Sequence, residues 1–181
     1  MAFTDLASIQ ETIDPNFHIA VNLRLDLLTE ETFRHWLINV VRGYGITPHT
    51  FGVEINENAN LSDTDHVTTY FDELKHAGIE VHMDDFSMGN TSITILQKNC
   101  FDYVKIDGNL IKQLDNERCM SIVSSIVQLG TQLNFSVIAE YVETEEQRNK
   151  LLRIGCNIFQ GYLYYKAMPC AQMKELLQKQ S

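Results

Sequence analysis

The most constraining feature of this sequence is a regular alternation between short apolar runs and longer segments with helical periodicity. Runs rich in β-branched and aromatic residues recur six times along the chain. They are HIAVNL, TFGVEI, IEVHMD, FDYVKI, FSVIAE and NIFQGYLYY, at residues 18–23, 50–55, 79–84, 101–106, 135–140 and 157–165. Strands that alternate with helices predict a parallel sheet joined by right-handed crossovers, and therefore an α/β fold.

Helical spacing of apolar residues predicts helices in the segments between these runs. The predicted helices cover residues 29–44, 61–78, 91–97, 118–133 and 145–154, and a further helix at 171–179 closes the chain. Gly155 follows the fifth of them directly and is placed as its C-terminal cap.

Two architectures fit this order of elements: an open doubly wound sheet and a (β/α) barrel. A barrel gathers the carboxyl ends of all its strands around one point, whereas an open sheet gathers only the ends beside its switch point. Each predicted strand carries a polar residue at or near its carboxyl end; these are Asn22, Glu54, Asp84, Lys105, Glu140 and Gln160. We therefore predict an incomplete TIM-like barrel over residues 1–181, a single domain with about six of the usual eight β/α units and the first strands missing.

Composition narrows the classes of partner. With 181 residues, of which 44% are hydrophobic, the chain can build one globular core. Its formal charge of −10 argues against a basic surface that would bind nucleic-acid polymers or anionic membranes. It has no apolar run of membrane-spanning length and no signal-peptide pattern. Its four cysteines lack zinc-ligand spacing, so we expect reduced thiols and a cytoplasmic protein.

The polar residues at the strand ends are mostly carboxylates. Glu54, the adjacent pair Asp84 and Asp85, and Glu140 converge in the predicted barrel, and Asn22 adds an amide oxygen. Ligands that are all oxygen suit Mg²⁺ or Mn²⁺. Adjacent carboxylates also suit a centre of two metal ions that binds a phosphate and activates a water molecule.

Lys105 is the one cation among these strand ends, and it could orient the water or offset charge that develops on phosphorus. Glu140 could act as general base, and Gln160 could hold a polar group of the ligand. Phosphodiester hydrolysis is therefore the leading reaction class. Alternatively, each of these polar residues could simply be a solvated turn residue or a helix cap. That explanation would have to hold independently at several successive strand ends, which makes it less attractive than a shared site.

Other catalytic patterns are weaker. The six histidines show no metal-ligand spacing, and we expect His82 to be packed or hydrogen-bonded, although it shares a strand face with Asp84. The sequence contains no GxSxG, Walker or GxGxxG motif.

Six segments of the chain resemble motifs of the EAL family of cyclic di-GMP phosphodiesterases. AVNLRLDLL resembles the family's VNxS strand, FGVEINE its ExTE strand, and MDDFSMGNTSITIL its DDFGTGYSSLxxL stretch. FDYVKIDGNLI resembles DxxKIDxxFI, VIAEYVETEEQ resembles VIAEGVETxEQ, and GCNIFQGYLYYKAMP resembles GCxxxQGYxxxxPxP. The resemblance runs from about Asn22 to Pro169.

This resemblance implies hydrolysis of cyclic di-GMP to linear pGpG at a two-metal centre that holds Mg²⁺ or Mn²⁺, in a modified (β/α)8 barrel. It implies that Lys105 contacts the attacking water and that Glu140 is the general base. The implied metal ligands are Asn22, Glu54, Asp84 and Asp85, and the implied supporting or substrate-side residues are Glu57, Asp107, Glu143 and Gln160.

The sequence also departs from the family pattern. It contains no Glu-Ala-Leu motif, and residues 1–17 are similar to the helix that follows that motif in the family. Ser87 and Tyr141 stand where the family has glycine. We therefore expect weak activity or none from this chain alone, and association with a second copy or a partner domain along an open barrel edge. The alternatives are a non-catalytic module that binds cyclic di-GMP or a protein, and a different metal-dependent phosphoesterase.

Overall fold

Six parallel strands form one sheet in the computed structural model, which describes residues 2–56, 64–87, 96–98 and 100–180. The strands are β1 (Ile19–Asn22), β2 (Phe51–Asn56), β3 (Ile79–Phe86), β4 (Tyr103–Ile106), β5 (Ser136–Ala139) and β6 (Ile158–Phe159). Each strand pairs with the next one along the chain, so the order is β1-β2-β3-β4-β5-β6. A doubly wound sheet would reverse its strand order at a switch point. The unbroken order confirms the prediction of an incomplete barrel.

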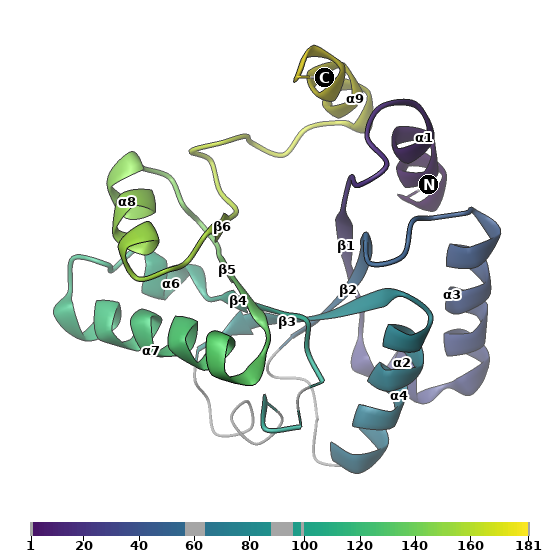
Figure 1. The fold of residues 1–181 in the computed structure, drawn as a ribbon, viewed down its shortest axis with the longest axis horizontal. Coiled ribbons are helices and arrows are strands. Elements are labelled where there is room, and N and C mark those ends of the chain that lie inside the picture. Colours follow the sequence, from purple (N-terminus) through teal and green to yellow (C-terminus); the bar gives the residue numbers. More distant parts are fainter. Residues whose placement is uncertain (1, 57–63, 88–95, 99, 181) are drawn as a thin grey trace.

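The described residues form helices, most of which lie on the outer side of the curved sheet (Figure 1). They are α1 (Ala2–Thr12), α2 (Leu25–Thr29), α3 (Glu31–Gly43), α4 (Thr64–His76), α6 (Gly108–Ile111), α7 (Glu117–Leu133), α8 (Glu145–Arg153) and α9 (Cys170–Gln180). The helix predicted over residues 29–44 corresponds to α3, and the short helix α2, which ends where that range begins, was not predicted. The predicted helix at residues 91–97 falls largely outside the described residues.

Capping residues explain where two of these helices begin. Asn116 accepts hydrogen bonds from the backbone N–H groups of Arg118 and Cys119 at the start of α7. At the start of α8, the Thr144 hydroxyl and the Gln147 side chain form a reciprocal capping box. Gly155 follows α8 with a φ of 89°, which agrees with its predicted capping role.

The two faces of the sheet differ in chemistry because side chains alternate along each strand. On β3, Ile79, Val81 and Met83 are buried beneath the outer helices. The residues between them, Glu80 and His82, belong to the opposite, inner face. The main core therefore lies between sheet and helices, and the concave face of the partial barrel is polar.

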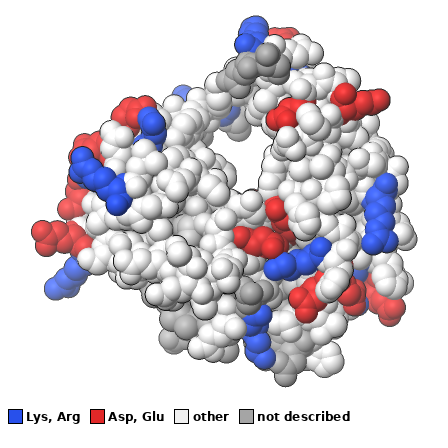
Figure 2. Space-filling model, in the orientation of Figure 1, with Lys and Arg blue, Asp and Glu red and all other residues white. Residues whose placement is uncertain are grey.

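The described sheet has two edges, at β1 and β6. In the space-filling view an opening passes through the molecule between these two sides, with charged side chains around it and over the outer helices (Figure 2). Helix α9 lies beside α1 across the top of this opening (Figure 1), where Lys174 Nζ is 3.2 Å from Ser8 Oγ. None of the helices among the described residues is long and apolar enough to span a membrane.

Candidate functional site

The centre of the candidate site is an ammonium group surrounded by carboxylates. Lys105 Nζ lies 2.9 Å from Asp84 Oδ1, 2.9 Å from Glu140 Oε1 and 3.1 Å from Glu54 Oε2. The four side chains come from β2, β3, β4 and the residue that follows β5, and each is at most 15% exposed. The structure thus brings together four of the predicted site residues at the carboxyl ends of neighbouring strands.

Burial and charge act against each other in this cluster. Burial opposes the charged form of Lys105, but its contacts with the carboxylates of Asp84 and Glu140 outweigh the effect of burial and raise the pKa of the ammonium. Burial also raises the pKa of Glu140, which the contact with Lys105 offsets only in part. The cluster holds more negative than positive charge and would gain from further cations.

A β-bulge places both members of the aspartate pair at the end of β3. The pairing of β3 with β4 shifts register between Met83 and Phe86, and Asp85 has a left-handed φ of 57°. The amide of Asn56 donates a hydrogen bond of 2.8 Å to Asp85 Oδ2. As a result, carboxylate oxygens of Asp84, Asp85 and Glu140 lie within 4.8 Å of one another.

Burial and the charges of Asp84 and Asp107 raise the pKa of Asp85. The three convergent carboxylates of Asp84, Asp85 and Glu140 form a set of oxygen donors that suits a hard divalent cation. The residues present therefore fit the predicted Mg²⁺ or Mn²⁺.

The remaining predicted residues lie around this cluster. Asn22 ends β1, is exposed, and is the register partner of Glu54. Asp107 caps α6 and accepts a hydrogen bond of 2.6 Å from the backbone N–H of Asn109. Glu143 and Gln160 are exposed in the segments after β5 and β6, and among the described residues neither side chain is paired with the cluster. Glu57 lies outside the described residues.

A cavity of about 360 Å³ adjoins the cluster on the side of Asp85 and Asp107. Tyr141 lines it with a left-handed φ of 53°. The ring is in close contact with Gly108, where an added Cβ would lie 2.1 Å from Tyr141 Cδ2. Lys112 Nζ lies 4.4 Å from the centre of the same ring.

A second group of polar side chains was not anticipated from the sequence. His18, Glu80 and His82 meet on the inner face of the sheet, although the histidines show no ligand spacing along the chain. The alternation of Glu80, His82 and Asp84 along the sequence could have placed these three residues on one face of the strand. The contact with His18 could not be predicted in this way, because it depends on the register of β1, β2 and β3.

Comparisons with known proteins agree with this fold. The model of the EAL domain family matches residues 1–167. The chain is 32% identical over 159 residues to the bifunctional diguanylate cyclase/cyclic di-GMP phosphodiesterase MucR of Pseudomonas aeruginosa, an alignment that covers 87% of this chain and 23% of MucR. It thus spans about a quarter of the length of that curated relative.

Solved structures give the same result. The EAL domain of Mycobacterium smegmatis DcpA superposes with a TM-score of 0.92 and 26% identity, over 98% of this chain and 81% of that one. The manganese and cyclic di-GMP complex of Klebsiella pneumoniae BlrP1 superposes with a TM-score of 0.78 and 27% identity, over 90% of this chain and 41% of that one. By sequence and by fold, this chain belongs to the EAL domain family.

Proposed function

We propose that this chain binds cyclic di-GMP at the carboxyl ends of its strands and hydrolyses it to linear pGpG with the help of two divalent cations, Mg²⁺ or Mn²⁺. The observation that carries the proposal is the cluster of Glu54, Asp84 and Glu140 around Lys105, in a chain of the EAL family. Relatives named as cyclic di-GMP phosphodiesterases and a relative crystallised with manganese and cyclic di-GMP support it.

Metal ligands in this proposal are the oxygen donors at the strand ends. Asp84, Asp85, Glu54 and Asn22 would hold the cations, which when bound neutralise charge on the phosphate and make a water molecule more acidic. Glu57 is assigned a supporting role by resemblance alone.

Two buried side chains, Glu140 and Lys105, act on the attacking water in this proposal. Glu140 accepts the proton of the attacking water, and its burial favours uptake of that proton. Lys105 orients the water and offsets negative charge that develops on the phosphoryl oxygens. Asp107, Glu143 and Gln160 are assigned to the substrate side on the family resemblance.

The level of activity is a separate part of the proposal. The sequence contains no Glu-Ala-Leu motif, so one anionic ligand of the family site is absent from these 181 residues. Fewer anionic ligands mean weaker metal binding. We therefore propose weak turnover by this chain alone, and the same observation favours the second candidate, a module that binds cyclic di-GMP without hydrolysing it.

Calorimetric titration with cyclic di-GMP, with Mn²⁺ or with a chelator, followed by chromatography of the products, separates these candidates. Turnover to pGpG supports hydrolysis, whereas binding without product supports the non-catalytic module. Neither binding nor product would refute both. Glu140→Gln should abolish product and keep binding, while Glu175→Gln, an exposed glutamate on α9, should change neither.

We further propose a cytoplasmic location and self-association or docking of a partner domain along the edges of the sheet. The four cysteines form no disulfide, as a reducing compartment allows. In the described sheet β1 and β6 each pair with a strand on one side only, and Ile158 on β6 is 40% exposed. Size-exclusion chromatography should show dimers or larger species at high concentration, and a monomer at every concentration would contradict self-association.

A further inference from the structure

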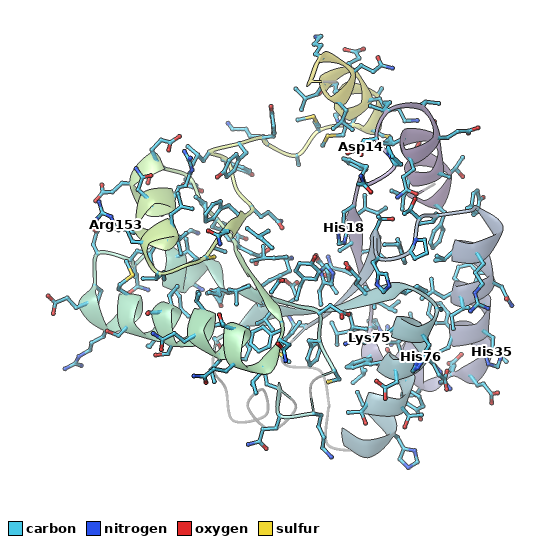
Figure 3. The ribbon with its side chains drawn as sticks, viewed as in Figure 1. Asp14, His18, His35, Lys75, His76 and Arg153 are labelled. Carbon is cyan, nitrogen blue, oxygen red and sulfur yellow. The ribbon has the colours of Figure 1, made fainter. Side chains whose placement is uncertain are left out.

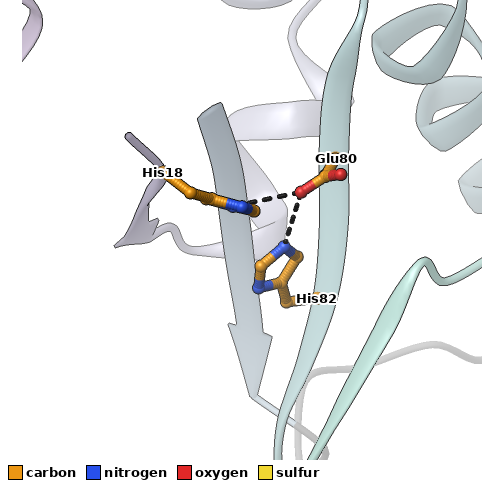
Figure 4. Close-up of side chains that lie close together, drawn as sticks. All are labelled: His18, Glu80 and His82. Carbon is orange, nitrogen blue, oxygen red and sulfur yellow. Dashed lines mark hydrogen bonds and ion pairs between the residues drawn. The ribbon is translucent and has the colours of Figure 1, made fainter. Parts of the chain in front are cut away.

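The inner face of the sheet carries a second cluster of potential ligands, next to the carboxylates around Lys105 and nearer the amino-terminal ends of the strands. Glu80 and His82 lie on β3, and His18 immediately precedes β1. The close-up shows both imidazole rings directed at the same carboxylate oxygen of Glu80 (Figure 4). The three side chains therefore converge from β3 and from the residue before β1, across the intervening strand β2.

Two distances within this cluster are close to those between ligands of one ion. His18 Nε2 lies 3.0 Å and His82 Nε2 lies 3.4 Å from Glu80 Oε2, and ligand atoms of all three side chains lie within 4.8 Å of one another. Bonds of about 2.0–2.1 Å in a tetrahedral arrangement place ligand atoms about 3.3–3.4 Å apart. Little movement would be needed to centre an ion among them.

Hydrogen bonding within the described residues does not satisfy this cluster. His18 Nε2 is buried and forms no hydrogen bond of acceptable geometry despite its short distance to Glu80. His82 is only 2% exposed; its Nε2 faces Glu80, and its Nδ1, which points away from Glu80 (Figure 4), has no hydrogen-bond partner among the described residues. The Glu80 side chain is 9% exposed, so a carboxylate is held in the interior beside two incompletely bonded imidazoles.

The backbone leaves room for the His82 ring. At Gly52 on β2, an added Cβ would lie 2.6 Å from His82 Nε2, so any other residue there would push the ring away. The ring of Tyr103 packs against the other side of the cluster, 4.6 Å from the His82 ring between centres.

We propose that His18, Glu80 and His82 bind a first-row transition metal ion of the zinc class. Two imidazoles and one carboxylate suit zinc, whereas magnesium prefers ligands that are all oxygen. Solvent can supply the fourth ligand, because His18 is partly exposed and lies beside the central opening (Figure 3).

Such an ion would act on the sheet rather than on a substrate. It would connect the residue before β1 to β3 across β2, and β1 is a four-residue strand at the edge of the sheet. The ion would therefore hold this edge strand in register. The proposal does not depend on hydrolysis of cyclic di-GMP.

The test is calorimetric titration of the metal-stripped chain with Zn²⁺ in excess Mg²⁺, which favours occupation of the all-oxygen cluster by Mg²⁺. We expect one Zn²⁺ per chain. His18→Gln and His82→Gln should each weaken binding at least about tenfold, since even the loss of a group that only supports a ligand costs that much. His18 is 32% exposed, so His18→Gln should keep the circular dichroism spectrum of the folded chain.

Two control variants keep the test specific. His35→Gln removes an exposed histidine of α3 that lies 4.0 Å from Glu31, and Figure 3 shows His35 on the outer helices, away from the opening. Asp85→Asn changes the other cluster. Both should bind Zn²⁺ as the unmodified chain does.

Co²⁺ should give the visible absorption of a four-coordinate ion in the unmodified chain and lose it in His18→Gln. The proposal is overturned if the chain binds no Zn²⁺, if His18→Gln and His82→Gln bind it normally, or if binding is lost in His35→Gln or Asp85→Asn instead. None of these readouts involves cyclic di-GMP, so failure here leaves the proposed function untouched.

Discussion

Replacing Lys105 with methionine should strongly destabilise the metal-free chain. Methionine keeps most of the volume of the side chain but removes the ammonium that lies 2.9–3.1 Å from Glu54, Asp84 and Glu140. Breaking a buried ion pair costs about 3–5 kcal/mol. Because three carboxylates share this one ammonium, we expect a loss of at least about 3 kcal/mol at neutral pH, a large part of the roughly 5–15 kcal/mol that stabilises a domain.

This cost should depend on pH in a defined direction. Without the ammonium, the pKa values of the neighbouring carboxyl groups rise in the folded chain, so the folded variant binds protons more tightly than the unfolded one. The destabilisation should therefore be small below about pH 4, grow as the pH rises through the ordinary carboxyl range of about 3.9–4.3, and be complete above the raised folded-state values. Added Mn²⁺ should restore part of the loss.

Urea unfolding of both proteins in a chelator, at pH 5 and pH 7.5, measures this effect. Lys75→Met is the matched control, because Lys75 lies 3.0 Å from Asp102 in a pair whose side chains are 29% and 26% exposed, and it should cost about 1 kcal/mol or less. A loss for Lys105→Met no larger than that of the control, or equal at both pH values, would refute the reasoning.

Three further predictions follow from the contacts of single residues. If Glu140 is the general base, kcat/KM should fall as the pH decreases through the pKa of Glu140. Burial raises this pKa above the ordinary glutamate value of about 4.3. A value of kcat/KM that stays constant down to about pH 4.3 would argue against that role. Thr144→Ala removes the capping box of α8 and should lower the free energy of unfolding in urea by about 1 kcal/mol, and an unchanged midpoint would contradict this. Gly161→Ala places a Cβ 2.2 Å from the carbonyl oxygen of Val142 and should lower the free energy of unfolding, measured by thermal unfolding, by at least about 1 kcal/mol. In the control Gly43→Ala the added Cβ meets no atom within 4 Å, so this variant should not lose stability. Equal effects of the two substitutions would show that the close approach at Gly161 does not matter.

The strands and their common polar end could be predicted because they depend on local patterns. Apolar runs of β-rich residues identify a strand wherever it pairs, and parallel strands present their carboxyl ends together. For this reason Glu54, Asp84, Lys105 and Glu140 were expected to converge, and they do. Helix α2 was not predicted, because it has only five residues and no side-chain cap at Arg24 and therefore carries little helical periodicity.

Backbone conformations near the site could not be predicted in the same way. The bulge at Asp84 and Asp85 comes from the pairing of β3 with β4, and β3 extends two residues past its predicted end. Tyr141 has a left-handed backbone that a bulky residue rarely adopts, held against Gly108 by tertiary contacts. The glycine that the EAL pattern has at this position is compatible with such a backbone.

Contacts between distant residues were also beyond the sequence. Glu143 and Gln160 follow strands as expected but remain exposed, because the segments after β5 and β6 turn at the surface. His18 and Glu80 are far apart in the chain and meet only through the register of three adjacent strands. Histidine spacing alone carries no information about such a contact.

The most direct test of the central claim is a crystal structure of the chain soaked in Mn²⁺, with the ion located by its anomalous scattering. The account predicts a manganese peak within bonding distance of the carboxylates of Asp84 and Asp85, at the carboxyl end of β3. A map with no peak there, or with manganese only at other carboxylates of the surface, would contradict it.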